Sequence, residues 1–356
     1  MRIGLDASYS LSREPTGVSV YSRRLIEEMA SQAPDDCLLL AYRFNRYFRS
    51  FAEPKPGRNC RRRLLEEPRI RRWAGQADLF HGLNQRLPEA RFRRSVATFH
   101  DLFVMTGEYS TPEFRSRFTK LAREAAARAD HIVAVSDFTA RQVEERLGYP
   151  REQITTVLHG ADPPPLIPAD VLDGLRRRHD LSGRFILHIG ALQTRKNVVR
   201  LVEAFEGLPV DLRLVLAGGA GMGAEAIFER IEHSPARARI MALGYVDAPT
   251  RAALLHTATV LAFPSLDEGF GIPALEAMAA GLPAVVSNRS ALPEVVGDAA
   301  VLIDPLETDS IRDGLVRVLE DEGMHQQLSR RGKERAEGLT WTRAAAETLA
   351  VYRSLS

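Results

Sequence analysis

The segment of this sequence best suited to binding or catalysis is a glycine-containing loop with two glutamates. Glu268 and Glu276 stand in the segment Asp-Glu-Gly-Phe-Gly-Ile-Pro-Ala-Leu-Glu, with seven residues between them. Gly269 and Gly271 let the backbone approach a ligand closely. Pro273 suits the first position of a helix, whose free N–H groups and positive dipole end would then face the loop. These residues predict a loop that binds phosphate at a helix N-terminus.

A basic pair earlier in the chain could neutralise such a phosphate. Arg195 and Lys196 follow a predicted strand and the loop Gly190-Ala191-Leu192-Gln193-Thr194, and Lys196 is one of four lysines in the chain. Arginine offers a fork to two phosphate oxygens, whereas lysine is a compact point charge. Because the loop follows a strand, it can turn both side chains toward a ligand. Two solvated loop cations are the alternative interpretation.

Strands and helices alternate along both halves of the chain and must position these groups. Apolar runs predict strands at 2–6, 37–42, 78–81, 95–99, 131–135, 154–158, 185–190, 212–217, 239–243, 258–263, 284–287 and 300–303. The alternation predicts an α/β fold of two doubly wound, Rossmann-like parallel-sheet domains. Ligands of such sheets bind at the carboxyl ends of strands, so two domains that face each other would form a central cleft. The arginine-rich segment 43–72 lacks a clear period and is expected to be irregular.

Three consecutive prolines mark the expected domain boundary. The prolines at 163–165 suit a stiff linker rather than a regular element. We therefore expect a first domain at 1–162 and a second at 163–338. A terminal helix within 339–356 is expected to pack back on the first domain.

Composition places the chain among ordinary globular proteins. It has 356 residues, of which 45% are hydrophobic and 26% charged, and no apolar run nears the roughly 20 residues that span a bilayer. The N-terminus lacks the features of a signal peptide, so a cytoplasmic protein is expected. Cys37 and Cys60 lack metal-ligand spacing and cannot build a disulfide framework, so both are interpreted as reduced and incidental.

The net charge of +2 conceals a gradient along the chain. Residues 1–100 hold 19 Lys and Arg against 11 Asp and Glu, whereas residues 201–356 hold 14 against 22. A basic first domain could contact an anionic membrane surface peripherally or bind a phosphate-bearing acceptor, and a solvated arginine face is the alternative. Nucleic acid is not expected as a partner, because no recognisable binding motif accompanies the arginines.

The glutamate loop and its surroundings resemble the signature of retaining glycosyltransferases of family 4, in particular bacterial mannosyltransferase-like members. The segments 190–196, 244–246 and 293–294, and the helix that begins at Trp341, fall where that family has its corresponding pieces. The resemblance covers essentially the whole chain. It implies the GT-B fold, with a first domain that binds the acceptor and a second that binds a nucleotide sugar.

The resemblance also implies donor contacts in the second domain. Arg195 and Lys196 would hold the diphosphate of the donor. The Glu276 carboxylate would accept hydrogen bonds from the ribose hydroxyls. Glu268 would contact the donor sugar near the reacting carbon. Further donor contacts would come from Gly190, Tyr245, Val246, Gly269, Phe270 and Gly271. The alternatives are a helix-start glutamate favoured by the dipole for Glu276 and a solvated loop acid for Glu268.

In the first domain, the resemblance points to His100 and Gly17. His100 would hydrogen-bond sugar hydroxyls and steady the charge that develops at the donor carbon, unless it is a structural histidine. Gly17 resembles a glycine loop whose backbone nears the diphosphate and the acceptor. Ser19 departs from the commoner Gly-x-Gly form, so only Gly17 carries over. Ser136 and His159 follow strands near the expected cleft and domain boundary. For both, a structural role weighs at least as much as a role in the site.

The expected function is the transfer of a sugar, with retention, from a nucleotide diphosphate to a glycan or lipid-linked polysaccharide intermediate. GDP-mannose is the first donor candidate, and UDP- and dTDP-sugars remain open. In the family's mechanism a donor phosphate oxygen takes the acceptor proton, and no residue here compels a nucleophilic carboxylate. No cofactor and no metal are expected, because Arg195 and Lys196 can replace the metal.

Three other functions are alternatives. A nucleotide-sugar epimerase on the same two-domain plan would turn over without an acceptor. A non-catalytic sugar-nucleotide binder would not turn over at all. A dehydrogenase is disfavoured, because no Gly-x-Gly-x-x-Gly follows the first strand.

Overall fold

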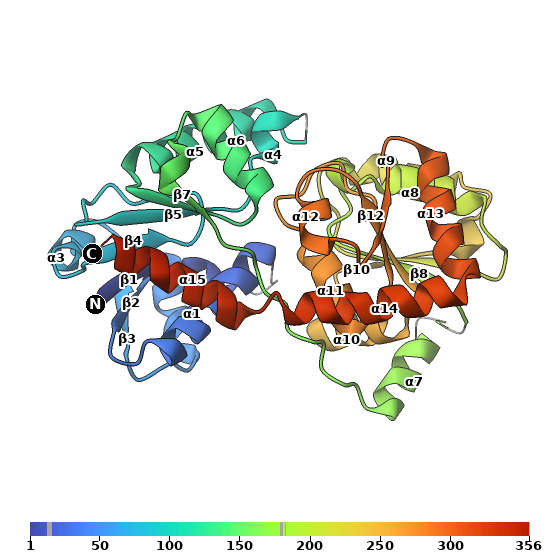
Figure 1. Cartoon of the computed structure of the whole chain (residues 1–356), viewed down its shortest axis with the longest axis horizontal. Helices are drawn as coiled ribbons and strands as arrows, with labels where there is room; N and C mark the ends of the chain where they lie inside the picture. Colours follow the sequence, from blue (N-terminus) through green and yellow to red (C-terminus); the bar gives the residue numbers. More distant parts are fainter. Residues whose placement is uncertain (13–15, 108, 179–180, 182, 356) are drawn as a thin grey trace. The chain divides into compact units, whose positions relative to one another are not determined.

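The chain folds into two compact units, shown in Figure 1. The computed structural model describes residues 1–12, 16–107, 109–178, 181 and 183–355. The first unit comprises Met1–Gly160 and Leu339–Ser356, and the second comprises Ala161–Gly338. The second unit is therefore inserted in the sequence between the body of the first unit and its last helix.

The described part of the first unit contains a parallel sheet in the order β3-β2-β1-β4-β5-β6-β7. Its strands are β1 (Arg2–Asp6), β2 (Cys37–Tyr42), β3 (Cys60–Leu64), β4 (Leu79–Gly82), β5 (Ser95–Phe99), β6 (His131–Ala134) and β7 (Ile154–Thr156). Its main helices are α1 (Gly17–Gln32), α2 (Phe44–Tyr47), α3 (Arg69–Ala74), α4 (Phe103–Thr106), α5 (Pro112–Arg128), α6 (Asp137–Leu147) and α15 (Trp341–Ser354). The strand order reverses between β1 and β4, which is the position where doubly wound sheets bind ligands.

The second unit repeats this plan with the order β10-β9-β8-β11-β12-β13 among its described residues. Its strands are β8 (Phe185–Ile189), β9 (Arg213–Ala217), β10 (Ile240–Gly244), β11 (Val260–Phe263), β12 (Ala284–Ser287) and β13 (Val301–Ile303). Its helices are α7 (Ala169–Arg178), α8 (Val198–Glu206), α9 (Ala224–Glu232), α10 (Ala248–Thr257), α11 (Ile272–Ala280), α12 (Leu292–Val296), α13 (Thr308–Glu320) and α14 (Glu322–Glu337). Its strand order reverses between β8 and β11.

Burial of the central strands on both faces explains why they are apolar throughout. All residues of β8 and of β11 are buried, as parallel strands covered by helices on both sides require. The expectation that 43–72 is irregular is wrong, because this segment contains β3. Three consecutive arginines hid that strand, and an edge strand can carry them because its residues are partly exposed.

The terminal helix α15 completes the core of the first unit. Trp341, Leu349 and Tyr352 pack with residues of α1 and of the sheet. The Tyr352 hydroxyl hydrogen-bonds the buried His81, whose other ring nitrogen lies 2.8 Å from the Thr98 hydroxyl. The Thr98 hydroxyl also lies 2.8 Å from that of Tyr21 on α1. This buried chain of hydrogen bonds joins α15, the sheet and α1.

A glycine marks the place where the chain leaves the first unit. A Cβ on Gly160 would lie 2.1 Å from the backbone nitrogen of Trp341, so a larger residue would force the two segments apart. The last residue of the outgoing segment therefore packs on the first turn of α15. Among the described residues, no helix is both long and apolar enough to cross a membrane.

Replacing Tyr352 with phenylalanine tests the buried chain of hydrogen bonds. The substitution removes the hydroxyl and leaves one ring nitrogen of His81 unsatisfied, so we expect a loss of about 1–3 kcal/mol in the unfolding free energy of the first unit. Both tryptophans, Trp73 and Trp341, lie in this unit. Tryptophan fluorescence during urea denaturation therefore reports its unfolding selectively.

The matched control is Tyr47→Phe, at a half-buried tyrosine on α2. It should change the same free energy by less than about 0.5 kcal/mol. Equal effects of the two substitutions would contradict a stabilising role for the buried chain.

Candidate functional site

The point where strand order reverses in the second unit brings the predicted charged residues together. The loop after β8 carries Arg195 and Lys196, and the loop after β11 carries Glu268. β8 and β11 are neighbours in the sheet, so both loops leave its carboxyl edge side by side. The structure therefore places residues that are 72 positions apart in the sequence in one buried group.

Glu268 forms ion pairs with both cations. Its Oε2 lies 3.0 Å from Nη1 of Arg195, and its Oε1 accepts a hydrogen bond from Nζ of Lys196. The three side chains are 10% exposed or less. Burial pushes the pKa of the Glu268 carboxyl up, but the charges of Arg195 and Lys196 outweigh burial and hold that pKa at about 2. We call these three residues the ion triad.

Residues at the ends of β8 and β11 surround the Lys196 side chain. Its Nζ lies 4.6 Å from the centroid of the Phe263 ring, a cation–π contact. Gly190 has a φ of +145°, and a Cβ there would approach the Lys196 side chain to 3.4 Å. His188 is fully buried on β8, and burial lowers its pKa to about 4, so its ring is neutral. Its Nδ1 bonds the Ala262 carbonyl oxygen at 3.0 Å.

Backbone contacts hold the two loops in register. The Leu266 N–H donates to the Arg195 carbonyl oxygen at 2.8 Å. The Asn197 side chain donates to the carbonyl oxygens of Pro264 and Pro305, at 3.2 and 2.6 Å. Asn197 also starts α8 with a left-handed φ of 59°. We did not predict this residue, although an asparagine just before an apolar helix is a typical start signal.

A second glycine-rich loop supports the first and was also missed. The Leu192 N–H donates to the Gly219 carbonyl oxygen, and the Gly221 N–H donates to the Leu192 carbonyl oxygen, both at 2.8 Å. A Cβ on Gly218 would lie 1.8 Å from the Gly190 carbonyl oxygen. Glycine is therefore required where the loop after β9 meets the loop that carries the cations. Two glycines directly after a predicted strand were the available signal.

The glycine loop leads into α11 beside the ion triad. Gly271 precedes the first helical residue, Ile272, and has a φ of +104°. A Cβ there would lie 2.5 Å from Cδ2 of Leu292, so this position favours glycine for two reasons. Phe270 is buried, and the Glu268 N–H donates to the Ser290 hydroxyl at 3.0 Å. The loop thus presents a fixed backbone at a helix N-terminus, where anions bind.

Glu276 is held by a residue that we did not predict. It lies on α11, and its Oε2 is bonded to Nη2 of Arg251 on α10. Burial lowers the pKa of the Arg251 guanidinium to about 10. Tyr245 is 52% exposed at the end of β10, next to the half-buried Val246. No sequence signal links Arg251 to a glutamate 25 residues away.

In the first unit, His100 lies in a buried aromatic group. Its Nε2 lies 3.0 Å from the Leu83 carbonyl oxygen. Its ring meets that of Tyr21 edge-on at 4.8 Å and lies 5.5 Å from that of His159. Burial lowers the pKa of His100 to about 4, so the imidazole is neutral. These contacts orient the ring, and its Nε2 already has a backbone partner.

Gly17 is the first residue of α1, one turn before Tyr21. Residues 13–15, just before it, lie outside the described residues. Ser19 has a local role, because its hydroxyl accepts a hydrogen bond from the Thr16 N–H in a capping box. Ser136 similarly caps α6 by accepting from the Thr139 N–H at 3.0 Å.

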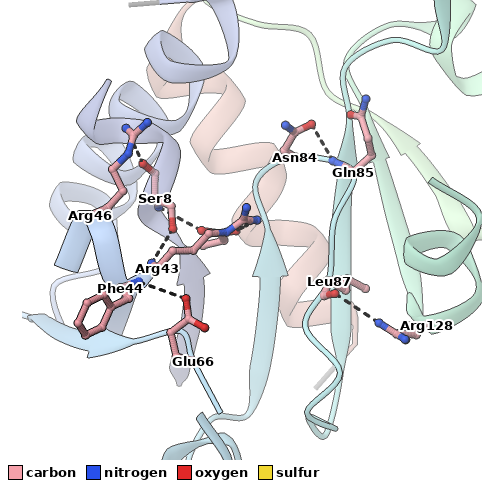
Figure 2. Close-up of polar contacts among 10 residues, drawn as sticks. Ser8, Arg43, Phe44, Arg46, Glu66, Asn84, Gln85, Leu87 and Arg128 are labelled. Carbon is pink, nitrogen blue, oxygen red and sulfur yellow. Dashed lines mark hydrogen bonds and ion pairs between the residues drawn. The ribbon is translucent and has the colours of Figure 1, made fainter. Parts of the chain in front are cut away.

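A cavity of about 320 Å³ opens at the carboxyl edge of the first sheet. Its lining follows four adjacent strands and part of α5: Asp6, Arg43, Leu65, Glu66, Arg86, Leu87, Pro88, Leu121, Glu124 and Ala125. Asp6 pairs with Arg43 at 3.4 Å. Figure 2 shows Glu66, whose carboxylate accepts a hydrogen bond from the Phe44 N–H at 3.2 Å. The cavity therefore combines carboxylates and guanidinium groups at the point where strand order reverses. In the described part of the chain, no group of three or more His, Cys, Asp or Glu residues could hold a metal ion.

Glu268→Gln tests the ion triad. The substitution leaves two buried cations without their counter-charge, so we expect the second unit to lose about 3–5 kcal/mol of unfolding free energy at neutral pH. The depressed pKa means that this stabilisation is complete above the unfolded pKa of about 4.3. It is lost as the pH falls toward 2, so the difference between the two proteins should shrink there.

Calorimetry at a series of pH values would measure the loss of stability and its pH dependence. The relevant transition is the unfolding of the second unit, which contains no tryptophan. The control is Glu232→Gln, which breaks an exposed ion pair to Arg237 and should cost less than about 1 kcal/mol. A Glu268→Gln deficit that does not change between neutral pH and pH 3 would contradict the assigned charge state.

Comparison with known proteins identifies the family of this chain. Residues 176–335 match the family model of glycosyl transferases group 1, and residues 15–164 match that of glycosyltransferase family 4. The O-antigen chain mannosyltransferase B of Escherichia coli is 33% identical over 303 residues, which cover 82% of this chain and 79% of the relative.

Solved structures show the same fold. Sucrose-phosphate synthase from Thermosynechococcus elongatus has a TM-score of 0.78 and 19% identity, covering 100% of this chain and 99% of that one. HepE from Anabaena, solved with UDP and glucose, has a TM-score of 0.76 and 16% identity, covering 99% of each chain. The predicted fold class and family are confirmed, and this chain belongs to the glycosyltransferases of family 4.

Proposed function

We propose that this glycosyltransferase moves a sugar from a nucleotide diphosphate to a glycan or lipid-linked acceptor, with retention at the anomeric carbon. The ion triad is the observation that carries the proposal. It places two cations and a carboxylate at the carboxyl edge of the second sheet, beside the N-terminus of α11. The cations suit a diphosphate, and the carboxylate suits sugar hydroxyls.

Donor binding exchanges partners within the triad. Without a donor, Glu268 forms ion pairs with both Arg195 and Lys196. A diphosphate competes for both cations, because its charge exceeds that of one carboxylate. The Glu268 oxygens are then released to accept hydrogen bonds from the donor sugar. The site thereby keeps its buried cations paired at every stage.

The transfer needs no nucleophile from the protein. The bond between the anomeric carbon and the donor phosphate oxygen breaks, and the bond to the acceptor oxygen forms on the same face of the sugar. The acceptor proton passes to an oxygen of the departing phosphate. Arg195 and Lys196 stabilise the charge that develops on that phosphate, which is the task that a metal ion would otherwise perform.

Mannose from GDP-mannose is the proposed donor sugar. The support is the relative named O-antigen chain mannosyltransferase B, at 33% identity. In this proposal, Glu276 accepts the ribose hydroxyls, and the exposed Tyr245 covers the base with Val246. His100 contacts the sugar as a neutral hydrogen-bonding group, as its lowered pKa requires.

The cavity of the first unit is the proposed acceptor site. It holds both hydrogen-bond donors, Arg43 and Arg86, and acceptors, Asp6, Glu66 and Glu124. Sugar hydroxyls both donate and accept, so a glycan can satisfy both kinds of group. We place this reaction on the cytoplasmic side of a membrane, where lipid-linked glycan intermediates can be reached.

Product analysis tests the proposed function. Incubation with GDP-mannose and a lipid-linked oligosaccharide should yield a product with the donor's anomeric configuration by NMR, also when EDTA is present. Arg195→Ala and Lys196→Ala should each lower kcat by about 100-fold or more, because each removes a fixed charge from the developing phosphate. Arg237→Ala, at an exposed residue of the same unit, is the control and should not change kcat.

Several outcomes would contradict the proposal. They are an inverted product, activity that disappears with EDTA, or native turnover in either cation variant. Conversion of the donor without an acceptor would instead indicate an epimerase.

The Arg251–Glu276 pair gives a second test within the donor site. Arg251 fixes one Glu276 oxygen, so that the ribose meets a carboxylate of defined orientation. Arg251→Gln should raise the donor KM about tenfold, equivalent to about 1.4 kcal/mol. With a donor that lacks the ribose 2′ and 3′ hydroxyls, native protein and variant should differ little.

Arg312→Gln, which breaks a surface ion pair to Asp309, is the control for this measurement. Equal loss with both donors would show that Arg251 does not act through the ribose. Tighter binding by the variant would show that Arg251 competes with the ribose for Glu276.

A further inference from the structure

The excess positive charge of the first hundred residues comes from one short segment. Residues 43–72 contain 11 Lys and Arg but three Asp and Glu, a difference of eight. Residues 1–100 as a whole hold 19 against 11, which is also a difference of eight. The remainder of that stretch therefore has no net charge, and the excess of basic residues lies within 43–72, from α2 through β3 into α3.

The same segment exposes three phenylalanines on one helical face. α2 (Phe44–Tyr47) runs through Phe48, which has helical φ and ψ, into the 3₁₀ helix η2 (Arg49–Ala52). Phe44, Phe48 and Phe51 recur at positions i, i+4 and i+7 and are 58%, 65% and 60% exposed. This spacing is that of an apolar stripe on a helix, but here the stripe faces solvent.

Ring contacts make these residues one cluster. Phe44 and Phe48 have ring centroids 5.5 Å apart, and Tyr47 lies 5.7 Å from Phe48 and 5.4 Å from Phe51. Soluble monomers rarely expose apolar groups gathered in this way without a binding role.

Arginines border the cluster. The guanidinium carbon of Arg62 on β3 lies 5.0 Å from the Phe51 ring centroid, and Arg46 and Arg49 lie on the helical segment itself. Arginines on an edge strand also discourage pairing with another sheet, but that role does not account for exposed phenylalanines. We call Phe44, Phe48, Phe51, Arg46, Arg49 and Arg62 the aromatic–arginine patch.

We propose that the aromatic–arginine patch docks the protein on an anionic lipid bilayer. Its phenylalanines would enter the boundary between headgroups and acyl chains, and its arginines would pair with lipid phosphates. A second copy of the chain is a poor occupant, because two segments that each carry eight excess positive charges would repel each other.

The patch adjoins the proposed acceptor cavity. The Phe44 N–H donates to Glu66 (Figure 2). Glu66 and Arg43 both line that cavity. The biological role of this docking rests on the proposed function, because the docking would bring the acceptor cavity to the membrane. A patch seated in the bilayer holds the cavity close to the headgroups of lipid-linked acceptors.

Vesicle flotation tests the docking with the full-length protein. It should bind vesicles that contain phosphatidylglycerol, bind pure phosphatidylcholine vesicles far less, and lose binding as salt is raised. Phe44→Ser/Phe48→Ser/Phe51→Ser and, separately, Arg49→Gln/Arg62→Gln should each lower the partition coefficient by about tenfold or more. Circular dichroism of each variant verifies that it is folded.

The control variants carry the same kinds of substitution at other exposed positions. Phe114→Ser/Phe228→Ser changes two other exposed phenylalanines, and Arg237→Gln/Arg330→Gln changes two other exposed arginines. Both controls should bind vesicles as the native protein does. Control variants that lose binding to the same extent, or native protein that does not bind anionic vesicles, would overturn the docking. Concentration-dependent dimers that only the phenylalanine variant abolishes, without vesicle binding, would also overturn it in favour of a second copy.

Activity separates this inference from the proposed function. On a water-soluble acceptor, the phenylalanine variant should retain native kcat/KM, and on an acceptor embedded in vesicles it should lose about tenfold or more. Equal activity of native protein and variant on the embedded acceptor would overturn the docking. Vesicle binding without transfer to any acceptor would overturn the proposed function and leave the docking supported.

Discussion

The buried pairing of Glu268 with Arg195 and Lys196 is the interaction on which the second unit's site depends. Each of these charges would be costly to bury alone. Because the three are paired, each side chain can be 10% exposed or less. The pairing is possible because β8 and β11 are adjacent, so that their loops leave the sheet side by side. Gly190 and Gly218 then allow these loops to approach within backbone contact. The fold and the charge arrangement therefore require each other.

The sequence predicted the sheets well because their strands are buried on both faces. Runs such as those of β8 and β11 contain almost no polar residue and end at a glycine or a proline. β3 escaped prediction because an edge strand needs only one covered face, and its three arginines conceal the apolar residues at its ends. The charged members of the candidate site were predictable because both loops carry recognisable motifs.

The parts of the site that could not be predicted depend on contacts between distant segments. Nothing in the sequence near Glu276 indicates that Arg251, on another helix, holds its carboxylate. Tyr21 similarly contacts His100 and His159 only because α1 packs over the sheet. Periodicity identifies a buried face, but it does not identify which residue of another element meets that face.

The position of α15, which belongs to the first unit but follows the second in the sequence, also has a consequence for synthesis. The core of the first unit includes Trp341, Leu349 and Tyr352, which the ribosome adds only after the entire second unit has been made. Domains generally fold as units during synthesis, so the second unit can fold while the first still lacks its last helix. Until then, the α1 surface that α15 will cover stays open to chaperones and to other chains. A ribosome that stalls within the second unit would therefore release a first unit with an unfinished core.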